Sequence, residues 1–425
     1  MSKQKNKKKL VPKLRFPEFR DTGEWVERKL GEITTRVTKK NKKGIKYPIY
    51  SINNTVGFLP QNDQFEGVDS NTRGYDIKLY KIIEKNTFAY NPARINVGSI
   101  GYSGELHNII ISSLYVCFKT KKEIEDKFLQ VFLGTFNFSQ SVKDNVEGGI
   151  RSYLFYENFS RIKIPLPPQS DEQQKIADCF SSLNDLFTSE AAKLEVLKAH
   201  KKGLMQKLFP TEGNTVPECR FSEFLNTGEW DKKTINQISK NVIAGGTPST
   251  LVTKYWDGHI RWMNSGELNL KKVYEVQGRI TEEGLQNSST KLIPKQCVLI
   301  GLAGQGKTRG TVAINMVELC TNQSIAAIFP NDAIFESNFL YHNLDHRYDE
   351  LRRLSTGSEG RGGLNLQIIK SLVVKLPSIP EQQKIADCLS SLDELITAQE
   401  QKIEALKAHK KGLMQGLFPS TEDDA

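Results

Sequence analysis

The sequence predicts an α+β protein in which two mixed α/β domains, here called heads, are each followed by one long coiled-coil helix. A 39-residue stretch occurs twice, at 172–210 and 381–419, and its copies share 28 residues at a constant offset of 209. Both copies have the apolar spacing of a coiled coil. The segments before them are rich in Ile, Val, Tyr and Phe between Gly, Asn and Pro breaks, which favours strands.

The composition is that of an ordinary globular protein. The chain has 425 residues, enough for two or three domains, and 38% of them are hydrophobic. No apolar run approaches the roughly 20 residues that cross a bilayer, and the N-terminus leads into no hydrophobic stretch. We therefore expect a cytoplasmic protein without membrane contact. The six cysteines have neither C-x-x-C nor zinc spacing, so reduced thiols and no metal site are expected.

The charge is compatible with DNA binding but does not establish it. The net charge is +10, and five of the positive charges are lysines within residues 1–9. We expect residues 1–12 to form a disordered basic tail. The remainder of the chain is only mildly basic, so a nucleic-acid partner needs further support.

The first head is predicted at 13–169. It opens with LRFPEF and GEW, and a similar line, CRFSEF and GEW, opens the second head 205 residues later. Its predicted strands are Tyr47–Ile52, Lys78–Ile83, Thr87–Tyr90, Ile109–Lys119 and Ile162–Leu166. Its predicted helix is Asp126–Phe138.

The first long helix is predicted at 170–210. Ser170 begins a capping-box pattern, and Pro210 ends the helix. Glu190 and Lys201 interrupt its apolar seam, and polar seam residues usually fix register or orientation at a cost in stability. The apolar seam comprises Ile176, Phe180, Leu183, Phe187, Leu194, Leu197, Leu204 and Leu208.

The second half repeats this plan. A linker is predicted at 211–218, the second head at 219–379, the second long helix at 380–418 and a tail at 419–425. The predicted strands of this head are His259–Met263, Cys297–Leu302, Thr311–Ile314 and Ser324–Phe329. Its predicted helix is Ser337–Leu354. Gln399 and Lys410 occupy the polar seam positions. The apolar seam comprises Ile385, Leu389, Leu392, Ile396, Ile403, Leu406, Leu413 and Leu417.

One segment matches a catalytic motif. GLAGQGKT, at 301–308, fits the G-x-x-x-x-G-K-[ST] pattern of nucleotide-binding P-loops. A P-loop opens a helix, however, whereas the following RGTVAI favours a strand. The corresponding position of the first head, Phe88–Gly101, lacks the motif. A P-loop ATPase acting on DNA therefore remains an alternative function, and a coiled-coil scaffold with protein-binding heads is another.

Polar, basic and aromatic residues interleaved with glycine are the remaining signal in both heads. Arg, Lys, Asn and Gln are the side chains that reach guanine and adenine edges, and glycine-flanked loops can enter a groove. The candidate DNA-binding residues are Lys42, Tyr47, Asn53, Arg94, Asn96, Arg151, Thr247, Ser249, Lys254, Trp262, Gln305, Lys307, Arg309 and Arg361.

The chain resembles the specificity subunit of type I restriction-modification systems. The resemblance rests on the duplicated order, on the junctions PLPPQSDEQQKIAD and KLPSIPEQQKIAD, on the opening lines and on AGGTPS at 244–249. It implies target-recognition heads and conserved spacer helices that pair antiparallel. The first head lacks GGTPS, so a contact role carries over only to Thr247 and Ser249.

The resemblance also implies partners. Such a subunit is not an enzyme and binds no cofactor itself. It recruits two modification subunits, which bind S-adenosylmethionine and methylate adenine in double-stranded DNA. Two restriction subunits, which are motor nucleases that use ATP and Mg²⁺, complete the complex.

Geometry suggests how such a chain would read DNA. If the two helices lie side by side in opposite directions, the heads are related by a pseudo-twofold axis and stand at opposite ends of a rod. Readers about 34–36 Å apart meet successive major grooves. We therefore expect a target of two different half-sites, with the helices setting the gap and docking the modification subunits.

Overall fold

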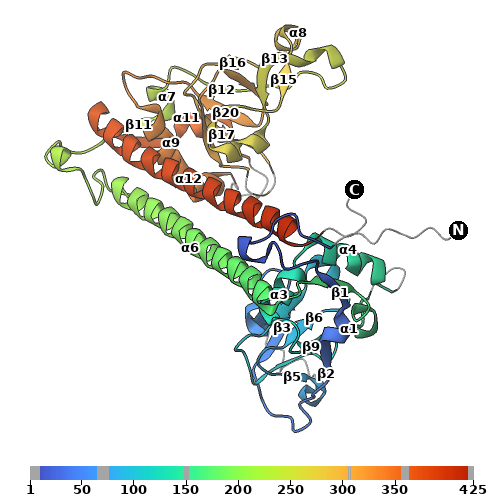
Figure 1. The fold of residues 1–425 in the computed structure, drawn as a ribbon. Helices are drawn as coiled ribbons and strands as arrows, with labels where there is room; N and C mark the ends of the chain where they lie inside the picture. Colours follow the sequence, from blue (N-terminus) through green and yellow to red (C-terminus); the bar gives the residue numbers. More distant parts are fainter. Residues whose placement is uncertain are drawn as a thin grey trace. The chain divides into compact units, whose positions relative to one another are not determined.

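The computed structural model describes residues 10–64, 76–147, 153–304, 306, 308–355 and 363–419 and is drawn in Figure 1. The chain forms two compact units, residues 1–190 with 402–425, and residues 191–401. Each unit contains one head and part of each long helix. Both units combine helices and strands, which confirms the α+β class. Most of the two predicted tails lies outside the described residues.

The described residues of the first head form three small sheets. Strands β1 (Val26–Lys29) and β10 (Lys163–Leu166) pair antiparallel. An antiparallel sheet has the order β2-β9-β6-β7, with strands Thr34–Val37, Val116–Thr120, Phe88–Tyr90 and Ile100–Tyr102. A mixed sheet has the order β4-β3-β8-β5, with strands Gly57–Pro60, Ile49–Asn53, Ile109–Ile111 and Lys81–Ile83, and its β3 and β8 run parallel.

The second head has the same plan. Strands β11 (Asp231–Thr234) and β21 (Val373–Leu376) pair antiparallel. One sheet has the order β12-β20-β17-β18-β14, with strands Val242–Ala244, Ile325–Ile328, Val298–Gly301, Val312–Asn315 and Lys272–Val273. The other has the order β15-β13-β19-β16, with strands Arg279–Ile280, Trp256–Met263, Leu319–Thr321 and Leu292–Ile293.

The two heads therefore share one topology. In both heads the first and last strands pair. A hairpin (β6–β7 or β17–β18) lies in the sheet that contains β2 or β12. A strand of the other sheet, β8 or β19, leads through a short turn into β9 or β20 of that sheet. The parallel pair β3–β8 corresponds to β13–β19. The second head adds the edge strand β14, parallel to β18.

Short helices complete the heads. Those of the first head are α1 (Leu30–Ile33), α2 (Gln61–Gln64), α3 (Asp126–Phe132), α4 (Phe136–Asn145) and α5 (Tyr156–Phe159). Those of the second head are α7 (Ile235–Ile238), α8 (Glu282–Gln286), α9 (Ser337–His346), α10 (Tyr348–Leu354) and α11 (Leu366–Ser371). Short 3-10 helices lie at Pro17–Phe19, Ile77–Leu79, Ile95–Val97, Ser222–Phe224, Thr253–Tyr255 and Ser265–Leu270.

Three predicted elements are wrong as single elements. The predicted strand Ile109–Lys119 is divided into β8 and β9, because a turn closes where Tyr115 N–H donates to the carbonyl oxygen of Ser112 (3.2 Å). The predicted helix Asp126–Phe138 is divided into α3 and α4, because Thr135 caps a new helix. The predicted helix Ser337–Leu354 is likewise divided, at Arg347.

The long helices are α6 (Ser170–Leu208) and α12 (Ile379–Leu417). In the first unit, Lys410 Nζ donates to Asn184 Oδ1 (2.7 Å) and Lys402 Nζ to Glu190 Oε1 (2.6 Å). Residue numbers fall on one helix as they rise on the other, so these two segments run antiparallel. In the second unit, Lys201 pairs with Asp393 and Lys198 with Glu400, which gives the same direction. All sixteen apolar seam residues are buried or half-buried.

Each head core continues into the helices. In the first unit, Trp25 of the GEW line packs edge to face on Phe418, with ring centroids 6.0 Å apart, and Phe128 lies 5.5 Å from the same ring. In the second unit, Phe339 lies 5.8 Å from Trp230 and 5.6 Å from Phe209. The repeated tryptophans and the phenylalanines that follow the helices thus belong to the same cores.

Candidate nucleic-acid interface

A buried ion pair fixes each head to its following helix. Arg15 donates from Nε and Nη2 to the two carboxylate oxygens of Glu172, both at 2.7 Å. Arg220 forms the same two bonds, both at 2.7 Å, with Glu381. The two carboxylates are 1% and 0% exposed. Hydrogen bonding to its carboxylate raises the pKa of each arginine above its usual value. We call these two pairs the joints.

The glutamine after each joint carboxylate also binds the head. Gln173 accepts from the backbone N–H of Glu125 (3.0 Å) and donates to the carbonyl of Glu123 (3.3 Å). Gln382 accepts from the backbone N–H of Glu336 (2.9 Å) and donates to two carbonyls. The repeated opening line and the repeated EQQ motif are therefore two halves of one contact. The sequence contained both halves, but nothing in their spacing showed that they meet.

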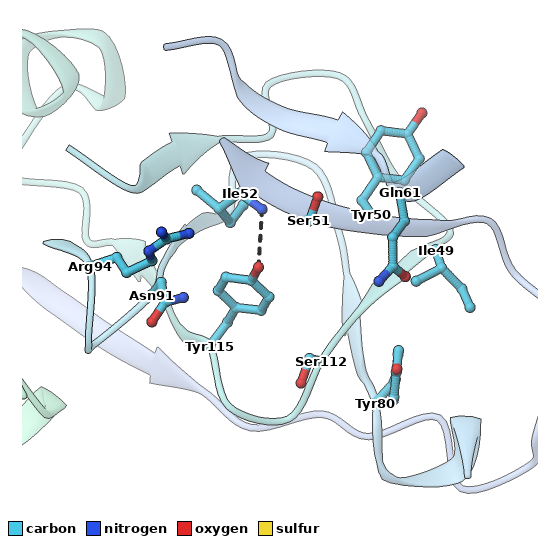
Figure 2. A pocket seen from close by; sticks show the side chains of 10 residues that line it. All are labelled: Ile49, Tyr50, Ser51, Ile52, Gln61, Tyr80, Asn91, Arg94, Ser112 and Tyr115. Atoms are coloured by element: carbon cyan, nitrogen blue, oxygen red, sulfur yellow. Dashed lines mark hydrogen bonds between the residues drawn. The ribbon is translucent and has the colours of Figure 1, made fainter. Parts of the chain in front are cut away.

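The first head has a polar pocket of about 230 Å³ beside the β6–β7 connection. Figure 2 shows Arg94 and Asn91 at one end and Tyr50 and Gln61 at the other, with Tyr115 between them. Tyr115 Oη accepts the backbone N–H of Ile52 (3.3 Å), which ties the β8–β9 turn to β3. The remaining lining residues are Ile49, Ser51, Tyr80 and Ser112.

Arg94 is the candidate best placed to contact a ligand in this pocket. Its side chain is exposed, and within the described part of the chain its guanidinium has no hydrogen-bond or ion-pair partner. The neighbouring Asn91 accepts from the backbone N–H of Ala93 (3.0 Å) through its side-chain oxygen, which leaves its amide nitrogen as a donor. These donors suit an acceptor such as a phosphate or a guanine edge. Of the residues that line the pocket, the sequence predicted Arg94 as a DNA contact, which stays a prediction, but it did not single out Asn91, Gln61 or Tyr115.

The other described candidates of the first head do not line this pocket. Lys42 and Asn96 are exposed, and Tyr47 is half-buried. Asn53 Oδ1 accepts from the backbone N–H groups of Thr55 (2.7 Å) and Val56 (3.3 Å), so it stabilises the β3–β4 turn. Arg151 lies outside the described residues.

In the second head, two tryptophans hold the GGTPS segment. Trp262 Nε1 donates to the carbonyl of Gly246 (3.0 Å), and Trp256 Nε1 donates to that of Ser249 (3.1 Å). The two rings meet edge to face at 5.1 Å. Trp262 is half-buried and thus supports the backbone of the segment through this hydrogen bond. Ser249, in contrast, is exposed. Thr247 Oγ1 donates to Gln323 Oε1 (2.6 Å).

The remaining candidates of the second head differ in whether their side chains are exposed and already paired. Lys254 is exposed but forms an ion pair with Glu283. Arg309 is half-buried, and its Nε is a buried atom without a hydrogen-bond partner among the described residues. Gln305, Lys307 and Arg361 lie outside the described residues.

The P-loop-like segment connects two antiparallel strands. It leads from β17 into β18, which pair through Ile300 and Val312, and not into a helix. A P-loop requires a helix at this point. Gly301 is needed here because an added Cβ would lie 2.3 Å from the carbonyl oxygen of Thr308. The close approach of Thr308 thus explains why a glycine stands at position 301. The segment occupies the same topological position as the β6–β7 connection of the first head.

Metal and membrane signals are also absent from the described residues. They contain no group of three His, Cys, Asp or Glu side chains that could hold a metal ion. His342 is fully buried, with Nε2 3.2 Å from Ser390 Oγ, and burial lowers its pKa well below the usual value. Among the same residues, every helix is too short or too polar to cross a bilayer.

Comparison with known proteins adds independent findings. A family model described as "Type I restriction modification DNA specificity domain" matches residues 22–199 and 227–408. A chain of Methanocaldococcus jannaschii, provisionally named type I restriction enzyme MjaX specificity subunit, is 24% identical over 93% of both chains. The type I restriction enzyme EcoR124I/EcoR124II specificity subunit of Escherichia coli is 28% identical over 56% of this chain and 57% of its own length.

Solved structures show the same fold. The structure of a type I restriction-modification system S subunit from M. genitalium covers 97% of this chain and all of its own, with a TM-score of 0.61 and 15% identity. A chain from a study of complex assembly and conformational transition of the type I R-M system covers 93% of this chain and 98% of its own. Its TM-score is 0.59, also at 15% identity.

Proposed function

The chain belongs to the family of type I restriction-modification DNA specificity domains, and we propose that it selects the DNA target of such a system without performing chemistry itself. One observation carries this proposal. Two heads that share one topology, apart from the added strand β14, are fixed by equivalent joints to nearly identical helices, yet their loops carry different side chains. A protein that reads two different short sequences at a fixed spacing needs this combination.

The reading surface of each head is proposed at its hairpin connection and the adjacent turn. In the first head this place holds the pocket of Arg94 and Asn91. In the second it holds the β17–β18 connection, where Leu302 N–H donates to the carbonyl of Ser324 (2.8 Å) in the β19–β20 turn. Because the side chains differ, the two half-sites should differ. A DNA target also places the protein in the cytoplasm.

The long helices are proposed as spacers and as docking sites for partners. Several exposed residues are identical in both copies, although exposed positions are free to diverge. They include an unusual exposed leucine, Leu186 (41% exposed) in the first unit and Leu395 (55%) in the second. Each unit thus carries the same surface, which suits one modification subunit per unit. Those subunits would bring S-adenosylmethionine, and restriction subunits would bring ATP and Mg²⁺.

Mapping methylated adenines tests this function. Cells that carry the chain together with its modification subunit should methylate a bipartite, asymmetric sequence with a constant gap. Exchanging the first head for that of another family member should change one half-site only. A coiled-coil scaffold would instead give no sequence-specific methylation. A change in both half-sites would contradict the proposal that each head reads one half-site.

A further inference from the structure

The β19–β20 turn of the second head holds one exposed glutamine in a fixed orientation. Gln323 lies in the turn and is exposed. Its Oε1 accepts the hydroxyl of Thr247 at 2.6 Å. Within the described residues its Nε2 has no hydrogen-bond partner. The amide is therefore held at one atom, while its two N–H donors and the second lone pair of Oε1 remain free.

The backbone of this turn is fixed from several directions. Asn322 N–H donates to the carbonyl of Met263 (3.0 Å), and Asn322 Oδ1 accepts from Ser324 N–H (3.1 Å). The carbonyl of Thr321 accepts from Gly246 N–H (2.8 Å) and from Thr290 Oγ1 (3.0 Å). The turn is thus bound to β13, to the GGTPS segment and to the residues before β16, so Gln323 stands on a rigid base.

The two glycines of GGTPS permit this contact. A Cβ on Gly245 would lie 2.0 Å from the carbonyl oxygen of Thr321, and one on Gly246 would lie 2.2 Å from Ser289 Oγ. Only glycine allows the segment to approach the turn, at Gly245, and the residues before β16, at Gly246, so closely. On the other side Trp262 and Trp256 hold the same segment through their indole N–H groups. The glycines and tryptophans together bring Thr247 to Gln323.

We infer that Gln323 reads an adenine in the major groove of the half-site bound by the second head, with Thr247 as its positioning residue. This inference rests on the proposed function. A glutamine amide pairs with adenine by donating from Nε2 to N7 and accepting the N6 amino group at Oε1. Thr247 occupies only one lone pair of Oε1, so both bonds to the base remain possible. Preorganisation reduces the side-chain entropy lost when they form.

The experiment uses the full chain in complex with its modification subunit. The target of the wild-type complex is mapped first, and the mapping is repeated with Gln323→Ala. The variant should accept other bases at one adenine position of one half-site, with discrimination falling about 10-fold to 100-fold, as for loss of a bidentate base contact. The other half-site should stay unchanged. Gln277→Ala, which removes another exposed glutamine of the same head, is the matched control and should keep the wild-type target.

Two further measurements separate base reading from loop support. Replacing the adenine at that position by 7-deazaadenine, which lacks the N7 acceptor, should weaken binding by the wild-type complex but not by Gln323→Ala. Thr247→Val should broaden the preference at the same position, whereas Thr247→Ser, which keeps the hydroxyl, should retain it.

Three outcomes are distinguishable. An unchanged target for Gln323→Ala, or a uniform loss of binding at all positions, would overturn the role of Gln323 and leave the proposed function standing. Equal sensitivity of wild type and variant to 7-deazaadenine would overturn it as well. Failure of the wild-type complex to methylate any bipartite sequence would refute the proposed function itself.

Discussion

The joints and the loops of the two heads differ in how closely they match. At the joints, Arg15 and Arg220 form the same two bonds to a buried glutamate, and each also donates to a glycine carbonyl eight residues ahead, Gly23 or Gly228. In the loops, the first head has the pocket lined by Arg94, and the second has Gln323, which is held by the hydroxyl of Thr247. The contacts that join head to helix are thus the same in both units, whereas the loops at which a ligand would bind differ.

Breaking a joint should produce the largest effect. Glu381→Ala leaves Arg220 buried without its partner, and such a change costs about 3–5 kcal/mol of unfolding free energy. Glu172→Ala should cost at least as much, because Trp25 Nε1 also donates to Glu172 (3.3 Å), whereas Trp230 Nε1 is buried without a partner among the described residues. Urea unfolding of the full chain measures both.

The exposed neighbouring pair supplies the control. Glu223 pairs with Lys384 at 3.1 Å, and both side chains are about half exposed. Glu223→Ala removes a carboxylate at the same end of the helix, but water can solvate the remaining lysine. It should leave the urea midpoint almost unchanged. A loss equal to that of Glu381→Ala would mean that the joint has no special role.

Removing Arg94 should change specificity in one half-site. A bidentate arginine contact to guanine contributes about 1–3 kcal/mol of discrimination. Arg94→Ala should therefore relax one position in the half-site of the first head, as measured by mapping methylated adenines. Lys42→Ala, an exposed lysine of the same head, should weaken binding without altering the sequence. A changed half-site for the second head would show that the loops are not independent.

The sequence predicted the repeats and the long helices better than the contacts of the joints and of the binding loops, for identifiable reasons. The seam and the repeats depend on local spacing, so they could be found without coordinates. The fold brings Arg15 to Glu172, and Thr247 to Gln323, across 157 and 76 residues. Nothing in a single sequence reports such distances. Thr135 and Arg347 divided two predicted helices because a capping residue or a local bend overrides a continuous apolar pattern.

The helix pairs differ at one equivalent position, which allows a matched exchange. Lys201 contacts Asp393 in the second unit, whereas Lys410 contacts Asn184, the residue equivalent to Asp393, in the first. Asp393→Asn should therefore lower the free energy of unfolding by about 1 kcal/mol, because the ion pair with Lys201 becomes a hydrogen bond between a charged and a neutral group. Asn184→Asp should give a gain of the opposite sign. Urea unfolding of both variants provides the measurement, and losses in both would contradict the equivalence.

The exposed leucines should give the smallest effect on the isolated chain and a clear effect on assembly. Leu186→Ser and Leu395→Ser change surface positions, so each should shift the unfolding free energy by no more than about 0.5 kcal/mol. Binding of the modification subunit, measured by titration calorimetry, should weaken in both variants to a similar extent, because the two units present the same residues. Val196→Ser, at a position that differs between the helix copies, is the control and should leave binding intact. If only one of the leucine variants weakened binding, the partner would recognise one unit, and the likeness of the two helices would reflect their packing alone.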